Sequence, residues 1–387
     1  MNIAIFTNNY LPNPYGVSTS VEGFRHALSA LGHTVYIFAP QWGENDEIEG
    51  NIFRYPAIKA PTKIDFSLVV PYSSQIDEEI DSLDLDIIHA QHPNLLGAVG
   101  SKWALKKDIP LVFTWHSLYD RYAHYTPFVP EKLSGYWAMK NAAGFAMESD
   151  YVIVPTNSII EVIRDTGVSH DRVRVVPSGV DEELFANPDG GSVRKKYNIS
   201  NDKIVLGTVS RLTEEKNVLF LANAVAKVLK NNKNVIFIGA GEGDLIEEMK
   251  EIFEDKKVVE QVIFTGKIKR GDVKNYLDAF DLFVYASTSE TQGTIVTENM
   301  YAGKPIVAIG QNGVGDLIED NVNGISVEEN EGKFVRALQR MIDSEELRNK
   351  MGQNAKKIAK EKYTTTACAQ NLLNVYDEAI EYYGNKS

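Results

Sequence analysis

One stretch of the chain, residues 286–308, restricts its fold and chemistry more than any other. It follows the apolar run 282–285, which indicates a buried strand, and it opens with small and hydroxyl-bearing residues. Apolar spacing then resumes, so we expect a helix to begin near Gly293 or Thr294, and a second buried strand at 306–308. Strand, polar loop, helix and strand form a βαβ unit. Its loop lies at the carboxyl end of a strand, where open α/β sheets bind ligands.

The loop of this unit carries groups that bind sugars and phosphates. Backbone amides of Gln292, Gly293 and Thr294 at a helix N-terminus attract phosphate or sugar oxygens. Glu290 and Glu298 are eight residues apart, on the loop and in the helix, so both are expected to point into one cavity. Carboxylates there accept hydrogen bonds from vicinal hydroxyls, as in a ribose or hexose. Taken alone, however, this spacing fits an ordinary charged surface helix better.

The composition excludes several classes of protein. With 387 residues, 43% hydrophobic and 24% charged, the chain is expected to form two globular domains. No apolar run is long enough for a membrane span, and the polar N-terminal segment indicates a first strand rather than a signal peptide. Cys368 is the single cysteine, which excludes an internal disulfide and fits a reducing cytoplasm. The net charge of −13 argues against a nucleic-acid partner.

The first half of the chain alternates strands and helices. The loop after its first strand contains Gly16 but no G-x-G-x-x-G fingerprint, so NAD binding is not supported. Asp84 and Asp86 match a D-x-D metal motif only by spelling, because they lie where a strand begins. The expected strands are 3–6, 35–38, 86–89, 111–114, 152–155 and 173–177, with helices at 18–31 and 158–166.

His116 is the candidate binding residue of this half. It follows the buried strand 111–114 at its carboxyl end, within T-W-H-S-L-Y-D-R-Y-A-H-Y. This cluster of histidines and tyrosines, which includes Tyr119, offers several groups that hydrogen-bond a sugar. A lone histidine is more often an ordinary surface or core residue, but the position of His116 at a strand end, inside this cluster, favours a functional role.

The second half begins afresh with a strand at 204–209, which ends in S-R-L-T-E-E-K-N. Arg211 and Lys216 are five residues apart at the start of a helix, so two cations and the helix dipole act at one point. A departing pyrophosphate gains negative charge, and such a site stabilises its transition state more than its ground state. From the spacing alone, a solvated lysine in an acidic run explains Lys216 about as well.

Two further loops follow expected strands of this half. Strand 235–238 leads into G-A-G-E-G, where Gly241 lets a nucleobase or ribose approach the backbone, although ordinary tight turning is an equal interpretation. Strand 262–265 leads into a loop that contains Lys267 and Ile268. Helices are expected at 334–347, 351–362 and 365–383.

Together these motifs resemble the retaining glycosyltransferases of family 4. T-S-E-T-Q-G followed by E-N-M-Y-A-G-K-P resembles the family's donor-binding motif, and S-R-L-x-x-x-K-N its phosphate-binding motif. P-S-G-V-D followed by Phe185 is similar to its end-of-domain signature. The loop around His116 resembles the branch that includes diacylglycerol glucosyltransferases. The family usually carries a glycine pair in the first loop, whereas this chain has Gly16 alone.

The resemblance covers nearly the whole chain and implies an architecture. This is the α/β GT-B fold, in which two doubly wound, Rossmann-like domains face each other across a cleft. Residues 1–187 would form the acceptor-binding domain, with helix 365–387 packing back on it. Residues 188–364 would form the nucleotide-sugar-binding domain, and N-P-D-G-G-S at 187–192 is the best linker by composition.

The resemblance also implies an activity, the retaining transfer of a hexose from a nucleotide sugar to an acceptor hydroxyl. UDP-glucose is the favoured donor, and the acceptor is expected to be a glycolipid or a lipid-linked glycan. In the family the leaving phosphate helps to deprotonate the acceptor, so no metal and no other cofactor is expected. The implied catalytic residues are His116, Arg211, Lys216 and Glu290. The implied substrate-binding residues are Gly16, Tyr119, Gly241, Lys267, Ile268, Gln292, Gly293, Thr294, Ile295 and Glu298.

Two other classes of protein remain as alternatives. A nucleotide-sugar 2-epimerase shares the fold but needs its own acid and base pair, and the E-x7-E loop argues against it. A non-catalytic sugar-nucleotide-binding protein would be expected to lose some of the motif residues, and all are present. The residues leave open the base, the hexose, the linkage, the acceptor and the oligomeric state.

Residues 1–183 contain more acidic than basic residues, so we expect a cytoplasmic protein with at most weak peripheral membrane contact. Two basic and aromatic helix faces are the candidate contact surfaces. They are Lys102, Trp103, Lys106 and Lys107, and Lys132, Trp137, Lys140 and Phe145.

Overall fold

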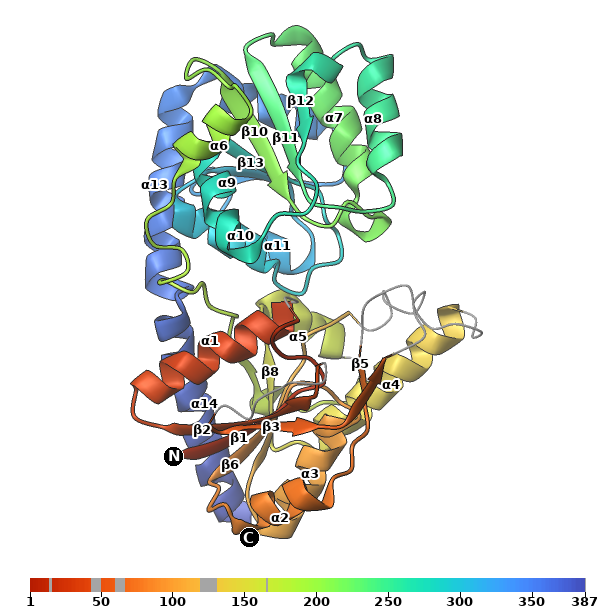
Figure 1. Ribbon diagram of the computed structural model, residues 1–387, viewed down its shortest axis with the longest axis vertical. Helices are drawn as coiled ribbons and strands as arrows, with labels where there is room; N and C mark the ends of the chain where they lie inside the picture. The colour runs from red at the N-terminus through yellow and green to blue at the C-terminus, as the bar shows by residue number, and fades with distance from the viewer. Residues whose placement is uncertain (14–15, 43–49, 60–66, 119–130, 165, 387) are drawn as a thin grey trace. The chain divides into compact units, whose positions relative to one another are not determined.

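The computed structural model describes residues 1–13, 16–42, 50–59, 67–118, 131–164 and 166–386. The chain forms two compact units (Figure 1). Met1–Gly179 and Thr365–Ser387 make the first, and Val180–Thr364 the second. The linker predicted at 187–192 is wrong, because these residues lie inside the second unit. There the Asp189 side chain caps helix α6 (Gly190–Lys196) by accepting from the Ser192 amide, so the aspartate and glycines of this segment start a helix.

The first unit is built on a parallel sheet in the order β3-β2-β1-β6-β7-β8-β9. The strands expected at 3–6, 35–38, 86–89 and 111–114 are confirmed as β1, β2, β6 and β7, and those at 152–155 and 173–177 as β8 and β9. The bounds are β1 (Asn2–Phe6), β2 (Thr34–Pro40), β3 (Ile52–Tyr55), β6 (Ile87–Ala90), β7 (Leu111–Thr114), β8 (Tyr151–Val154) and β9 (Val173–Val175). A separate antiparallel pair consists of β4 (Ala57–Lys59) and β5 (Ser67–Val69).

Helices cover both faces of this sheet. One face is covered by α1 (Gly16–Ala30) and α14 (Thr365–Lys386), which pack against each other and bury Leu28 and Leu372 among strand side chains. On the other face lie α2 (Ser74–Ser82), α3 (Leu96–Lys107), α4 (Glu131–Glu148) and α5 (Asn157–Arg164). The C-terminal helix therefore belongs to the first unit, although the chain reaches it from the second.

The second unit repeats the design with a parallel sheet in the order β12-β11-β10-β13-β14-β15. Its strands are β10 (Ile204–Val209), β11 (Val235–Ala240), β12 (Val262–Phe264), β13 (Leu282–Tyr285), β14 (Ile306–Ile309) and β15 (Gly324–Val327). One face carries α7 (Val218–Asn231), α8 (Ile246–Asp255) and α12 (Glu331–Asp343). The other carries α6, α9 (Val273–Ala279), α10 (Thr294–Ala302), α11 (Asn312–Leu317) and α13 (Glu345–Lys362). Single turns of 3-10 helix are η2 (His170–Arg172), η3 (Glu214–Lys216), η4 (Val259–Gln261) and η5 (Arg270–Asp272).

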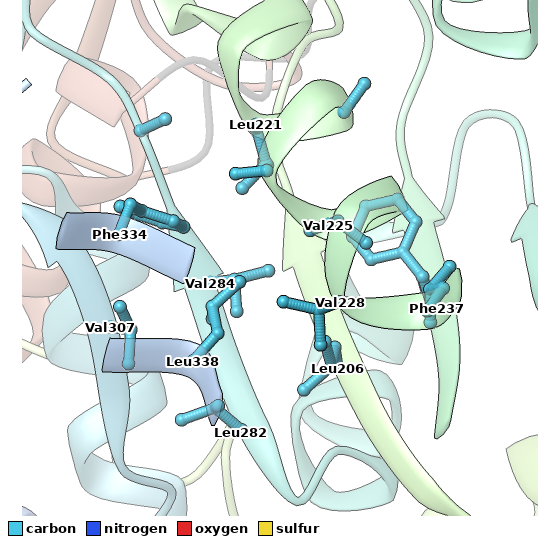
Figure 2. Packing of buried hydrophobic residues seen from close by; sticks show 14 of the residues in the cluster. Leu206, Leu221, Val225, Val228, Phe237, Leu282, Val284, Val307, Phe334 and Leu338 are labelled. Carbon is cyan, nitrogen blue, oxygen red and sulfur yellow. The ribbon is translucent and has the colours of Figure 1, made fainter. Parts of the chain in front are cut away.

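The core of the second unit follows from strands that are apolar on both faces, as expected for a parallel sheet between two helical layers. Leu206 and Val284 of the central strands pack against Leu221 and Val225 of α7 and Leu338 of α12 (Figure 2). Each such buried side chain contributes about 1.5–3 kcal/mol relative to an exposed one. This packing fixes the strand ends, and these in turn position the loops that follow them.

The two helix faces predicted as membrane-contact surfaces are partly wrong. Trp103 is 4% exposed and Phe145 is 7% exposed, so both belong to the core of the first unit. Lys106 lies 4.2 Å from the centre of the Trp103 ring and pairs with Asp81 at 2.7 Å. Trp137 remains 57% exposed on α4. Within the part of the chain that the structure describes, no helix combines the length and apolar character needed to cross a membrane.

Each sheet has one point where the strand order reverses. In the first unit the chain runs outward from β1 to β2 and β3, and then returns to the other side of β1 as β6. In the second unit the chain runs outward from β10 to β11 and β12, and then returns to the other side of β10 as β13. The connections on the two sides of such a point diverge, which leaves a binding crevice at the carboxyl ends of the strands. The α/β, doubly wound class expected from the sequence is confirmed.

Candidate functional site

The loops that follow β10 and β13 meet at the reversal point of the second unit. Lys216 at the end of η3 donates from its Nζ to the Oε1 of Glu290, at 2.5 Å, although 74 residues separate them. The Ser289 hydroxyl donates to the backbone carbonyl of Glu215 at 3.0 Å, and the Ser287 hydroxyl oxygen lies 3.3 Å from the same carbonyl. The structure therefore joins the S-R-L-x-x-x-K-N motif to the E-x7-E loop.

Glu290 is held as a carboxylate. Its Oε1 also accepts hydrogen bonds from the Tyr285 hydroxyl at 2.7 Å and the Ser287 hydroxyl at 3.0 Å. Burial alone would raise the pKa of Glu290, but the Lys216 ammonium and these donors outweigh it and lower the pKa below its ordinary value. Tyr285 and Ser287 were not predicted as site residues, although both adjoin the predicted loop.

Arg211, the other predicted cation, also lies beside a carboxylate. Its Nη2 is 2.8 Å from the Oε1 of Glu215, four residues later in the chain. The Arg211 side chain is 45% exposed, whereas that of Lys216 is 11% exposed. The two cations thus differ in how deeply they are embedded. Arg211 and Lys216 are each paired with a carboxylate.

Glu298 forms a bidentate ion pair that the sequence did not predict. The Nη1 of Arg270 donates to its Oε2 at 2.9 Å, and the Nη2 donates to its Oε1. Glu298 lies on α10 and is 4% exposed, and Arg270 comes from η5, with its guanidinium 5.3 Å from the centre of the Phe185 ring. No spacing rule links these residues, since they come from different elements 28 positions apart.

The backbone of this site depends on two glycines. Gly293 caps the start of α10 with φ of +79°, a conformation that other residues rarely adopt. Gly241 has φ of +144°, and a β-carbon there would lie 1.8 Å from the Ser210 carbonyl oxygen. Its amide donates to the Gly266 carbonyl at 3.1 Å. The loops after β10, β11 and β12 are thereby packed together.

The remaining residues predicted in this unit lie around these loops. Gln292 is buried at the start of α10, followed by Thr294 and Ile295 in its first turn. Lys267 and Ile268 follow Gly266 directly, and Lys267 is exposed. The structure therefore brings the predicted donor-binding residues together at one edge of one sheet.

His116 and Gly16 belong to the first unit. His116 lies just beyond β7 and makes a 2.6 Å hydrogen bond through its Nε2 to the Oε1 of Gln91, which follows β6. The Nδ1 of neighbouring His92 accepts from the Asn8 amide at 3.1 Å. Asn8, Gln91 and His92 therefore lie at the reversal point of this sheet, and sequence reasoning missed all three.

Burial lowers the pKa of His116 to about 3, and the neighbouring histidines His92 and His89 add to the shift. Burial likewise lowers the pKa of His92 to about 4. Both rings are thus neutral near pH 7. Because an amide oxygen accepts, the His116 proton sits on Nε2, and Nδ1 is the nitrogen that accepts a hydrogen bond. Gly16 begins α1, and Tyr119 lies outside the described residues.

Comparison with known proteins agrees with this geometry. The model of "Glycosyltransferase Family 4" matches residues 14–184, and that of "Glycosyl transferases group 1" matches residues 191–358. An alpha-monoglucosyldiacylglycerol synthase of Acholeplasma laidlawii is 30% identical over 406 residues, covering 100% of this chain and 99% of that protein. One of Streptococcus pneumoniae is 31% identical over 333 residues, covering 84% of this chain and 74% of that protein.

Solved structures agree on the fold. Anabaena HepE, crystallised with UDP and glucose, superposes with a TM-score of 0.77 at 19% identity, covering 98% of this chain and all of that one. The two doubly wound units therefore form the GT-B fold, that of a glycosyltransferase. The chain belongs to glycosyltransferase family 4, as its motifs indicated.

Proposed function

We propose that the protein is a retaining hexosyltransferase that moves glucose from UDP-glucose to an acceptor hydroxyl on a glycolipid or a lipid-linked glycan. One observation carries the proposal, the 2.5 Å contact between Lys216 and Glu290. It joins a phosphate-binding motif to a sugar-binding loop at the reversal point of a doubly wound sheet, where such sheets bind their ligands.

The cations at this point suit a departing nucleoside diphosphate. A pyrophosphate would take Arg211 and Lys216 as partners and weaken their contacts with Glu215 and Glu290. Because the pyrophosphate gains negative charge as the sugar leaves, these fixed cations stabilise the transition state more than the bound donor. Glu290, released in part from Lys216, then accepts from hydroxyls of the hexose.

We assign the binding of the ribose and the base to groups of the second unit next to these cations. Glu298, oriented by its two bonds from Arg270, accepts from the ribose hydroxyls. The backbone of residues 266–268 lies next to Gly241 and contacts the base. In the first unit, His116 contacts the transferred sugar, and its orientation is set by Gln91. As a neutral ring that donates its Nε2 proton to Gln91, it accepts at Nδ1 from a sugar hydroxyl.

Similar proteins support UDP-glucose as the donor and a lipid as the acceptor. A structural neighbour is described with UDP and glucose, and two relatives are named for the glucosylation of diacylglycerol. The loop around His116 supports the same lipid-glycosylating branch. We assign the reaction no metal, because the leaving phosphate itself assists deprotonation of the acceptor. We propose that the protein acts in the cytoplasm, with at most weak peripheral contact at the inner membrane face.

A panel of nucleotide sugars, read by release of UDP or GDP in the presence of diacylglycerol or glycolipid acceptors, tests the proposal. UDP release with UDP-glucose, formation of an α-glycoside by NMR, and retention of activity in EDTA are expected. Lys216→Ala provides the control, with turnover lowered about tenfold or more. An epimerised nucleotide sugar would identify the 2-epimerase instead, binding without turnover would identify a non-catalytic protein, and restoration by a divalent ion after EDTA would exclude the metal-free reaction.

A further inference from the structure

A chain of buried polar groups runs from the C-terminal helix to the strand ends that carry His116. The ring of His89, in β6, is 1% exposed. Its Nδ1 lies 2.7 Å from the Tyr376 hydroxyl of α14, and its Nε2 lies 2.6 Å from the Thr114 hydroxyl of β7. Both ring nitrogens of this histidine are therefore occupied by hydroxyls from two other elements of the same unit.

This chain of groups lies directly beside the Gln91–His116 pair. His89 and Thr114 are 25 residues apart, and so are Gln91 and His116. Side chains two positions apart in a strand point to the same face. The strand ladders extend that far, because the Gln91 amide donates to the Phe6 carbonyl and the Trp115 amide to the Ile153 carbonyl. The β6–β7 register places His89 opposite Val112, so the His89–Thr114 contact is diagonal, and the Gln91–His116 contact repeats it two residues further along the same face.

The direction of the hydrogen bonds follows from the chemistry of the groups. Burial lowers the pKa of His89 to about 3, so the ring is neutral and carries one proton. A phenol is a better donor and a poorer acceptor than an aliphatic hydroxyl. The Tyr376 hydroxyl therefore donates to Nδ1, and the proton on Nε2 is donated to Thr114. The Tyr376 hydroxyl thus determines which nitrogen of His89 carries the proton, and that N–H holds the Thr114 hydroxyl as its acceptor.

The rest of the surroundings of Tyr376 is apolar. Its side chain is 0% exposed and packs among residues such as Val112, Ile153 and Leu372. Phenylalanine would fill this space equally well, and a buried hydroxyl is costly unless it is hydrogen-bonded. The hydrogen bonds of Tyr376 and His89 therefore fix the position of α14 relative to β6 and β7, which apolar packing alone does not do.

We propose that Tyr376, His89 and Thr114 are positioning residues, which hold the ends of β6 and β7 so that Gln91 orients His116 for sugar transfer. The C-terminal helix thereby takes part in the reaction without touching the substrate. The proposal rests on the proposed function of His116, and the experiment below separates the two.

Tyr376→Phe removes only the hydroxyl, and Tyr383→Phe on the same helix is its matched control, since the Tyr383 hydroxyl bonds Asp108 at the surface. Thr114→Val and Thr114→Ser form a second pair, in which only serine retains the hydroxyl. We expect kcat to fall about tenfold in Tyr376→Phe and Thr114→Val, with the KM for the nucleotide sugar unchanged. Tyr383→Phe should match the wild type, and Thr114→Ser should regain most of the activity.

The second readout does not depend on activity. Nitrogen-15 NMR of the histidine rings, assigned with His116→Asn, should show changed ring shifts of His116 in Tyr376→Phe and Thr114→Val but not in the two controls. Unchanged His116 shifts in both variants would overturn the positioning role. An equal loss of kcat in Tyr383→Phe would also overturn it, since the effect would then be general to the helix. If no donor supports transfer, the proposed function fails, while the ring shifts still decide the positioning role.

Discussion

At the scale of single residues, Arg211 and Lys216 are expected to have separable effects. Both are assigned to the pyrophosphate, and loss of a charged hydrogen bond of roughly 1.5–3 kcal/mol lowers turnover about ten- to more than a hundredfold. Lys216 is 11% exposed and balances Glu290, which is 15% exposed, whereas Arg211 is 45% exposed. Arg211→Ala should therefore lower kcat alone, and Lys216→Ala should lower both kcat and the melting temperature. Near-wild-type kinetics in both variants would contradict the phosphate assignment.

The two glutamates are distinguished by the ligand that each is assigned to hold. Glu298→Ala should weaken the binding of free UDP and of UDP-glucose equally, because the ribose is common to both. Glu290→Ala should weaken only the sugar-bearing donor. Isothermal calorimetry with the two ligands measures the difference, and Arg270→Lys should follow Glu298→Ala, since lysine cannot form the bidentate pair. The reverse pattern of affinities would refute the assignment of both glutamates.

At the scale of elements, the βαβ unit from β13 to β14 was predicted almost to the residue. Its strands are continuous apolar runs, and Gly293 and Gly303 mark the two ends of α10. Such local signals suffice where burial and helix capping agree. The edge strand β3 was not predicted, because its sequence I-F-R-Y is only partly buried and includes a charged residue.

The candidate site was predicted less completely than the fold. Motif residues such as Lys216 and Glu290 each stood out locally, but their contact joins elements 74 residues apart. The Arg270–Glu298 pair and the Gln91–His116 pair likewise depend on which strands become neighbours, and no spacing in the sequence encodes that. Composition also misled at 187–192, since Asp and Gly serve a helix start as well as a linker.

The link between η3 and the loop after β13 is expected to depend on pH. The folded-state pKa of Glu290 is below its ordinary value, so its stabilisation is fully present above about pH 4.5 and is lost as the pH falls through the lower, folded value. Breaking this nearly buried pair, whose side chains are 11% and 15% exposed, costs about 3 kcal/mol at neutral pH. Denaturant titrations of the wild type and Glu290→Gln should therefore differ by about that amount at pH 7, and by less near pH 3. If the difference in free energy of unfolding stays constant from pH 7 to pH 3, protonation of Glu290 is not what weakens this link.

At the scale of the whole molecule, the similarity to lipid glucosyltransferases favours membrane binding, whereas the negative net charge opposes it. The relatives named for diacylglycerol act on a lipid, and Trp137 and Tyr136 are 57% and 60% exposed on α4, with Lys140 5.5 Å from the Trp137 ring. An anionic surface attracts each basic residue by only about 1 kcal/mol, however, and the net charge of the chain is −13. Of the other predicted face, Trp103 is buried, and Lys106 and Lys107 bond groups of their own unit.

We therefore expect weak binding to anionic liposomes, carried by the exposed aromatic pair on α4 rather than by charge. In flotation assays a minor fraction of the protein should rise with the vesicles, and moderate salt should not release it, because burial of apolar surface is little affected by screening. Trp137→Ala should abolish this fraction, with Leu105→Ala, an exposed apolar residue of α3, as the matched control. Tight co-flotation that salt reverses would instead show that local clusters of lysine outweigh the net charge, and would strengthen the case for diacylglycerol as the acceptor.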